Sequence, residues 1–229
     1  MTANLKQLIA AARLLHPLLD ELVFVGGSVT GLLITDEGAA EPRTTLDVDA
    51  IVEITSYAQY AAFGDRLRAL GFAEDTTEDA PLCRWVHRTT ILDVMPLDAK
   101  ILGFSNRWYR AAMDASVTRR LMDDLEIRLI TAPFFLATKF EAFQGRGQRD
   151  FFGSQDLEDV ISVVDGRASL VTEIQAASAE LRAYIRDHTG RLLAVPEFLD
   201  ALLGYLLPDA ASQARISTVL SRLEALARL

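Results

Sequence analysis

Hydrophobic residues in the first 131 positions occur mainly in short runs rich in β-branched side chains, a pattern typical of strands. Strands are predicted within residues 21–27, 46–54, 83–97 (two strands joined by a turn near Arg88) and 126–133. Apolar residues at helical spacing predict helices over residues 4–16, 28–34 and 56–72, the last stopped by Gly71. The first part of the chain is therefore expected to combine strands and helices in one α/β-type domain.

From residue 132 onward the pattern is helical. Pro133 suits the first turn of a helix over residues 132–143, and a loop punctuated by glycines follows at 144–154. Further helices are predicted over residues 155–166, 168–187, 196–206 and 210–228. The chain is expected to divide near residue 131, into a domain over residues 1–131 and a helical domain over residues 132–229.

Three aspartates stand inside the predicted strands. Side chains two apart on a strand share a face, so Asp47 and Asp49 point the same way, and Asp93 lies within the apolar run TTILDVMPLD. A buried charge is costly unless it is paired or binds a cation. If the two strands are neighbours, the three carboxylates suit hard divalent cations such as magnesium. Two such ions about 3.5–4 Å apart hold the attacking and leaving oxygens of a phosphoryl or nucleotidyl transfer.

These motifs resemble a known family. The chain resembles the polymerase-β-like nucleotidyltransferases in three features: a Gly-Ser after a strand, a same-face Asp-x-Asp on the next strand, and an aspartate on a third strand. The segment RTTLDVD at 43–49 is similar to the Arg-x-Thr-x-Asp-x-Asp motif of AbiEii/AbiGii-type members, which include toxins of toxin–antitoxin systems. The segment from Ala137 to Arg167 is similar to their second half, with a helix lysine, an Arg-Gly loop and a helix opening with Asp-x-x-Asp. The likeness runs from about Phe24 to Arg167, and the loop from Ser28 to Asp47 is longer than the family's.

The resemblance implies an α+β fold, with a nucleotidyltransferase core built on a mixed sheet and a helical C-terminal part that completes the nucleotide cleft. It implies transfer of a nucleoside monophosphate from an NTP to a hydroxyl, with tRNA a candidate acceptor and a cognate antitoxin a candidate partner. Asp47 and Asp49 would bind two magnesium ions, and Asp93 would bind one of them and accept the hydroxyl's proton. The residues expected to bind the nucleotide are Gly27, Ser28, Arg43, Thr45, Lys139 and Asp156.

Each of these nucleotide-binding residues also has a structural alternative. Ser28 is placed to cap a helix, and Arg43 and Thr45 are placed to lock the loop before the Asp-x-Asp strand. Lys139 lies on an apolar helix stripe, so it either reaches out to solvent or faces a polar cleft and neutralises phosphate. Asp156 is either an active-site acid or a first-turn acid that favours the helix dipole, and the dipole role is preferred for Asp159.

Composition narrows the range of functions. The net charge of −9 argues against a broad basic surface for nucleic acid, although local groups remain, such as Arg107 with Arg110 and Arg146 with Arg149. The single cysteine, Cys83, excludes an internal disulfide and fits a reducing cytoplasm. No apolar run is long enough to suggest a membrane span, and the N-terminal segment is typical of an amphipathic helix rather than a signal peptide. A second hypothesis is a catalytically silent member of the fold that binds nucleotide or a protein partner.

Overall fold

The computed structural model describes residues 1–146 and 150–229. Its contacts divide the chain into two compact units, each described separately below. The first unit comprises Met1–Val29 with Thr44–Thr131, and the second comprises Thr30–Arg43 with Ala132–Leu229. Among the described residues, no helix is long and apolar enough to cross a membrane.

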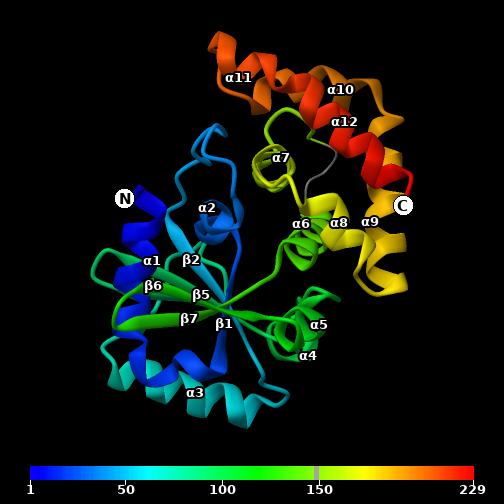
Figure 1. Ribbon diagram of the computed structural model, residues 1–229. Coiled ribbons are helices and arrows are strands. Elements are labelled where there is room, and N and C mark those ends of the chain that lie inside the picture. The colour runs from blue at the N-terminus through cyan, green and yellow to red at the C-terminus, as the bar shows by residue number, and fades with distance from the viewer. Residues whose placement is uncertain (147–149) are drawn as a thin grey trace. The chain divides into compact units, whose positions relative to one another are not determined.

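The first unit is built on one mixed sheet (Figure 1). In the described residues the sheet has seven strands in the order β3-β4-β5-β2-β1-β7-β6. The strands are β1 Leu22–Val25, β2 Asp47–Val52, β3 Ala73–Glu74, β4 Arg84–His87, β5 Thr90–Pro96, β6 Val117–Met122 and β7 Leu125–Leu129. The central strand β2 pairs in parallel with β5 and antiparallel with β1. The predicted α+β core with a mixed sheet is confirmed.

The first unit also contains helices. They are α1 Ala3–Leu14, α3 Tyr57–Ala69, α4 Ala99–Leu102 and α5 Tyr109–Asp114, with 3₁₀ turns η1 His16–Glu21 and η2 Gly27–Val29. The α3 residue Gly64 lies against the ring of Trp85, because a Cβ there would be 3.0 Å from the ring. Trp85 is the register partner of Leu92, which is the partner of Val48. Since these three side chains share one face, the aspartates on the alternate positions are left for the opposite face.

Local signals fix several element ends in this unit. The Ser56 hydroxyl accepts the amide of Gln59 and begins α3, and Gly71 takes a φ of +87° just beyond its end, as predicted. Cys83 and Trp85 are core residues, and burial raises the pKa of the Cys83 thiol to about 12. The edge strands β3 and β6 are not predicted by the hydrophobic pattern.

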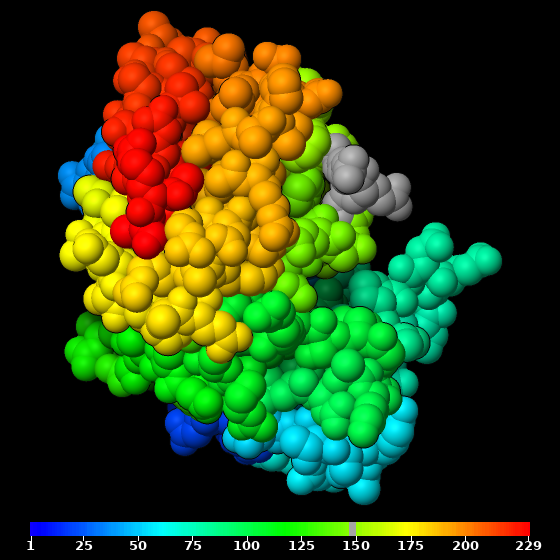
Figure 2. All heavy atoms as spheres, turned by 90° about the vertical axis from the view of Figure 1, so that its right-hand side faces the viewer, coloured from blue at the N-terminus to red at the C-terminus, as the bar shows by residue number. Residues whose placement is uncertain are grey.

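The second unit is helical, as predicted. Its helices are α2 Thr30–Leu33, α6 Ala132–Arg146, α7 Gln155–Gly166, α8 Leu170–Gln175, α9 Ala179–Leu193, α10 Pro196–Ala201, α11 Ala210–Ala214 and α12 Ile216–Ala227, with the 3₁₀ turn η3 Leu202–Tyr205. Helix α6 packs on α7 and α9, and α12 (red) lies beside α9 (gold) on the surface (Figure 2). The segment before Arg43 is tied to α7, because the amides of Thr35 and Asp36 both donate to the Gly166 carbonyl at 2.9 Å.

Several helix boundaries in the second unit differ from the prediction. The helix expected over 196–206 changes to the 3₁₀ turn η3 at Leu202, and the helix expected over 210–228 is divided into α11 and α12. The single helix expected over 168–187 is two helices, α8 and α9, because the Ser178 hydroxyl accepts the amide of Leu181 and starts a new helix there. Helix α9 then continues to Leu193. Helix α6 runs three residues beyond the predicted end at residue 143, through Arg146. Arg149 lies outside the described residues.

Candidate active site

Strand pairing brings the three predicted aspartates to one face of the sheet. Asp49 in β2 is the register partner of Asp93 in β5. Asp47 lies two residues before Asp49 and points to the same face. In the antiparallel pair of β4 and β5, Arg84 is the partner of Asp93. Because register partners share a face, Arg84 joins the three carboxylates on that side of the sheet.

Arg84 supplies positive charge to this cluster. Its Nε donates to Asp93 Oδ1 at 2.9 Å, and its Nη2 donates to Asp93 Oδ2 at 2.8 Å and to Asp47 Oδ2 at 2.9 Å. The bond to Asp93 is bidentate, the strongest geometry for an arginine–carboxylate pair. The Asp93 side chain is only 8% exposed, so this pairing offsets much of its desolvation cost. Hydrogen bonding to Asp93 raises the pKa of Arg84 further, and the guanidinium stays charged.

Gly26, at the end of β1, gives the Asp49 carboxylate its space. Its φ of +69° lies in the left-handed region that glycine adopts readily. A Cβ on Gly26 would lie 2.0 Å from Asp49 Oδ2, far inside contact distance. Any side chain at this position would therefore displace the carboxylate as well as strain the turn.

Gly27 and Ser28 follow in the 3₁₀ turn η2. The Ser28 hydroxyl is buried and has no hydrogen-bond partner within the described part of the chain, so the alternative that it caps a helix is wrong. An unsatisfied buried hydroxyl is unfavourable, and a phosphate oxygen would satisfy it. Nucleotide binding by Gly27 and Ser28 stays a prediction.

The carboxylate cluster suits magnesium in its donor chemistry, because hard oxygen ligands are what that ion requires. In residues 1–146 and 150–229, however, no three Asp, Glu, His or Cys side chains are positioned to hold a metal ion. Arg84 Nη2 lies within 2.9 Å of one oxygen of Asp47 and one of Asp93. A metal ion shared by those two oxygens would have to displace this nitrogen.

Lys139 lies in the second unit and binds two acids of helix α7. Its Nζ is 2.6 Å from Asp159 Oδ2 and 3.1 Å from Asp156 Oδ1. Asp156 also accepts from Arg146 Nε at 3.1 Å and Nη2 at 3.0 Å. Burial disfavours the Asp156 carboxylate, but Lys139 and Arg146 outweigh it and hold its pKa below the usual range. Lys139 therefore does not reach out to solvent, since its side chain is 9% exposed.

The loop residues Arg43 and Thr45 make locking contacts. Arg43 Nε and Nη2 donate to the two oxygens of Asp159 at 3.1 and 3.2 Å. The Thr45 amide donates to Asn4 Oδ1 at 3.0 Å, and its hydroxyl donates to the Asp47 carbonyl at 3.1 Å. These bonds agree with the loop-locking alternative, and nucleotide contacts from either residue stay predictions.

Sequence reasoning missed three residues of this arrangement. Arg84 and Gly26 were not among the predicted site residues, although Arg84 stands on the strand before Asp93 and Gly26 directly precedes the predicted Gly-Ser. Asp159 is 1% exposed and bonds Lys139 and Arg43, so the preferred helix-dipole role does not describe it. Asp156 likewise bonds Lys139 and Arg146 rather than serving only as a first-turn acid.

Solved structures that resemble the whole chain include two from Helicobacter pylori. One, a "putative nucleotidyltransferase from H. pylori", superposes with a TM-score of 0.51 at 11% identity, covering 100% of this chain and 96% of that one. The other, JHP933 from Helicobacter pylori, gives a TM-score of 0.50 at 11% identity and covers 100% of this chain and 93% of that one. The chain has a nucleotidyltransferase-like fold. Neither protein-family profiles nor curated protein sequences gave a match, and membership of the AbiEii/AbiGii-type family stays a prediction.

The substitution Arg84→Gln tests whether Arg84 balances the negative charges of Asp47 and Asp93. The substitution leaves Asp93 and Asp47 without this partner, and removing one partner of a largely buried ion pair costs about 3 kcal/mol. Urea unfolding at pH 7 should show this loss of stability. The matched control is Arg110→Gln, which breaks an exposed pair with Glu53 and should cost less than about 1 kcal/mol. Equal unfolding midpoints for the two variants would contradict the role given to Arg84.

Proposed function

We propose that the protein is a magnesium-dependent nucleotidyltransferase that transfers a nucleoside monophosphate from an NTP to a hydroxyl acceptor. The observation that carries the proposal is the placement of Asp49 beside Asp93 in register, with Asp47 on the same face of the sheet. Three carboxylates on one face of a sheet repel one another, and carboxylates are the donors that hold divalent cations in nucleotidyl transfer. The nucleotidyltransferase-like fold supports the same activity.

The carboxylates of Asp47, Asp49 and Asp93 would hold magnesium. When bound, the metal would neutralise charge on the triphosphate and polarise the phosphorus that is attacked. The acceptor hydroxyl would attack the α-phosphorus, a new ester bond would form, and the bond to pyrophosphate would break. Asp93 would take the hydroxyl proton. The orphaned Ser28 hydroxyl would donate to a phosphate oxygen, and tRNA is the acceptor that the family resemblance favours.

One observation supports a second candidate, a catalytically silent member of the fold. Arg84 already binds Asp47 and Asp93, so the acids have a structural partner without any metal. In a silent protein this ion pair would persist when nucleotide binds. In the active protein, magnesium and NTP would compete with Arg84 for the same oxygens.

Thermal unfolding with and without magnesium separates the two candidates. A ligand that binds only the folded state adds RT ln(1 + [L]/Kd), which is about 2.7 kcal/mol at a hundredfold excess over Kd. For a chain of this size that corresponds to about 5–10 °C in Tm. The active protein should show this shift with magnesium plus NTP and a much smaller one with NTP alone.

The same experiment has two outcomes that favour the second candidate. Equal Tm shifts for NTP with and without magnesium indicate a silent nucleotide-binding protein. No shift under either condition contradicts nucleotide binding, and of the second candidate it leaves only the form that binds a protein partner.

A further inference from the structure

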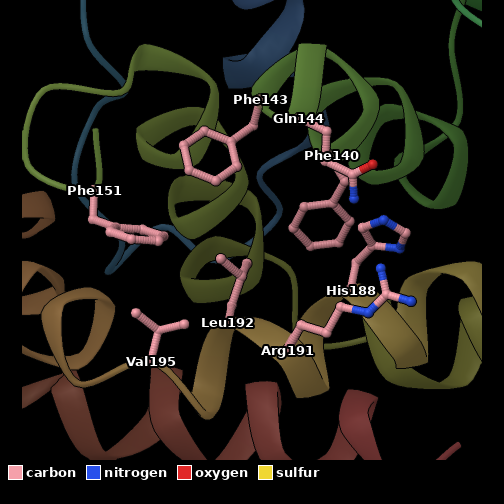
Figure 3. Close-up of a pocket in the computed structure, with 8 residues that line it drawn as sticks. All are labelled: Phe140, Phe143, Gln144, Phe151, His188, Arg191, Leu192 and Val195. Atoms are coloured by element: carbon pink, nitrogen blue, oxygen red, sulfur yellow. The ribbon is translucent and has the colours of Figure 1, made fainter. Parts of the chain in front are cut away.

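The helical unit contains a cavity that none of the proposed chemistry uses. Its volume is about 330 Å³, which lies in the range of small-molecule sites. It is formed by residues of α6 and α9 together with Phe151 and Val195 (Figure 3). The residues that line it are Phe140, Phe143, Gln144, Phe151, His188, Arg191, Leu192 and Val195.

One end of the cavity is aromatic and aliphatic. The rings of Phe143 and Phe151 lie 5.6 Å apart between centroids and are tilted by 48°. Leu192 and Val195 complete this apolar part (Figure 3). Rings arranged in this way favour a flat, apolar ligand, since stacked and edge-on aromatic contacts add to the free energy of burial.

The other end carries polar groups that can make further hydrogen bonds. Figure 3 shows the Arg191 guanidinium and the His188 ring near one another, with the Gln144 amide above them. Both Arg191 and Gln144 are solvent-exposed, and neither side chain makes a hydrogen bond or an ion pair within the described ranges. An unpaired guanidinium beside an apolar cavity favours a ligand with an anionic group.

His188 adds a hydrogen-bond acceptor at this end. Its Nδ1 lies 2.7 Å from the Tyr184 carbonyl, which can only accept, so Nδ1 carries the hydrogen. Burial lowers the pKa of His188, the ring is neutral at pH 7, and Nε2 is therefore an acceptor. Within the described residues Nε2 is buried and has no partner. An N–H or O–H group on a ligand would satisfy it.

We infer that this cavity binds a small aromatic anion. The flat body of the ligand packs against the phenylalanine rings, its negative group pairs with Arg191, and a donor near that group reaches His188. The site lies within the helical unit and is independent of the aspartate cluster. If the cavity did not bind such a ligand, the proposed nucleotidyl transfer would therefore be unaffected.

Fluorescence titration with 8-anilino-1-naphthalenesulfonate tests this site, because the probe combines two aromatic groups, an N–H donor and a sulfonate. The folded protein should bind one equivalent. Arg191→Gln should weaken binding about tenfold, the loss expected for a hydrogen bond to a charged group. The uncharged probe N-phenyl-1-naphthylamine should bind the wild type and Arg191→Gln equally. The matched control Arg186→Gln, on the same helix and outside the cavity lining, should change neither affinity.

A second variant, Val195→Trp, fills the cavity and should abolish the binding of both probes, with circular dichroism confirming that the helices remain. Unchanged sulfonate affinity in Arg191→Gln would overturn the inference. Retained one-to-one binding in folded Val195→Trp would also overturn it, because the probe would then occupy another place. If Val195→Trp does not fold, the Arg191→Gln titration alone decides.

Discussion

Asp49→Asn is expected to fold normally and to lose nucleotidyl transfer by at least about a thousandfold, which corresponds to about 4 kcal/mol of transition-state stabilisation. The two side chains are nearly the same size, so the close approach of Gly26 to the carboxylate is preserved. The amide lacks the negative charge that a hard cation requires. Removing one of three neighbouring negative charges also relieves repulsion. The Tm should therefore stay within about 3 °C of the wild type or rise.

Asp65→Asn is the matched control for this substitution. Asp65 lies on α3 with a side chain that is 78% exposed, and its neutralisation should leave transfer unchanged. Transfer is measured as incorporation of label from NTP, and folding is measured by thermal unfolding. If Asp49→Asn retained the activity of Asp65→Asn, the metal role of the aspartate cluster would be excluded. If Asp49→Asn lost activity only because it failed to fold, this result would also count against the metal role of the cluster.

Lys139→Met is expected to destabilise the protein by about 3 kcal/mol, because it leaves two buried carboxylates without their shared lysine. Asp159 and Asp156 have side chains 1% and 7% exposed, and Lys139 Nζ contacts both. Methionine fits the apolar stripe of α6, so a packing defect is not the cause of the loss. The stripe considered alone predicts the opposite, namely unchanged or slightly increased stability.

A double-mutant cycle isolates this interaction. Asp159→Asn combined with Lys139→Met should cost less than the sum of the two single changes, because the partner charge is removed together with the lysine. Arg146→Met is the exposed control, since that side chain is 73% exposed and should contribute less than about 1 kcal/mol. The coupling free energy is obtained from urea unfolding of the wild type, the two single variants at Lys139 and Asp159, and the double variant. Wild-type stability in Lys139→Met would show that the lysine is not needed by its acidic partners.

The placement of the three aspartates could be predicted because strand geometry is local. The two-residue period of β2 puts Asp47 and Asp49 on one face, and the apolar run around Asp93 identifies a buried strand. That β2 and β5 are neighbours depends on the order of strands in the sheet, which no single segment encodes. The same order places Arg84 opposite Asp93, which explains why the counter-cation was missed.

The environment of Lys139 also could be predicted only in part from the sequence. Its place on an apolar stripe follows from the helical period of α6, which leaves open whether the side chain reaches solvent or faces a polar cleft, and the structure shows it buried. Its partners lie 17 and 20 residues further along, on a different helix, so the pattern gave no sign of them. The amphipathic pattern of α7 marks Asp156 as bordering the buried face, but it cannot show which cation that carboxylate meets.

The elements missed by the hydrophobic pattern have few buried side chains. In β6 the side chains from Val117 to Arg120 are exposed, so an edge strand of this kind lacks apolar alternation. The break between α8 and α9 depends on one capping hydroxyl, Ser178, in a segment whose composition is helical on both sides.

The most direct measurement is transfer of label from each of the four α-³²P-labelled NTPs, incubated with the protein, magnesium and total tRNA. We expect a labelled macromolecular product and stoichiometric pyrophosphate with at least one NTP. Both should require magnesium and be absent with Asp49→Asn. The same assay is repeated with a panel of other hydroxyl acceptors in place of tRNA. The proposed nucleotidyltransferase activity would be contradicted if no NTP gave labelled product or pyrophosphate above the Asp49→Asn background with any acceptor.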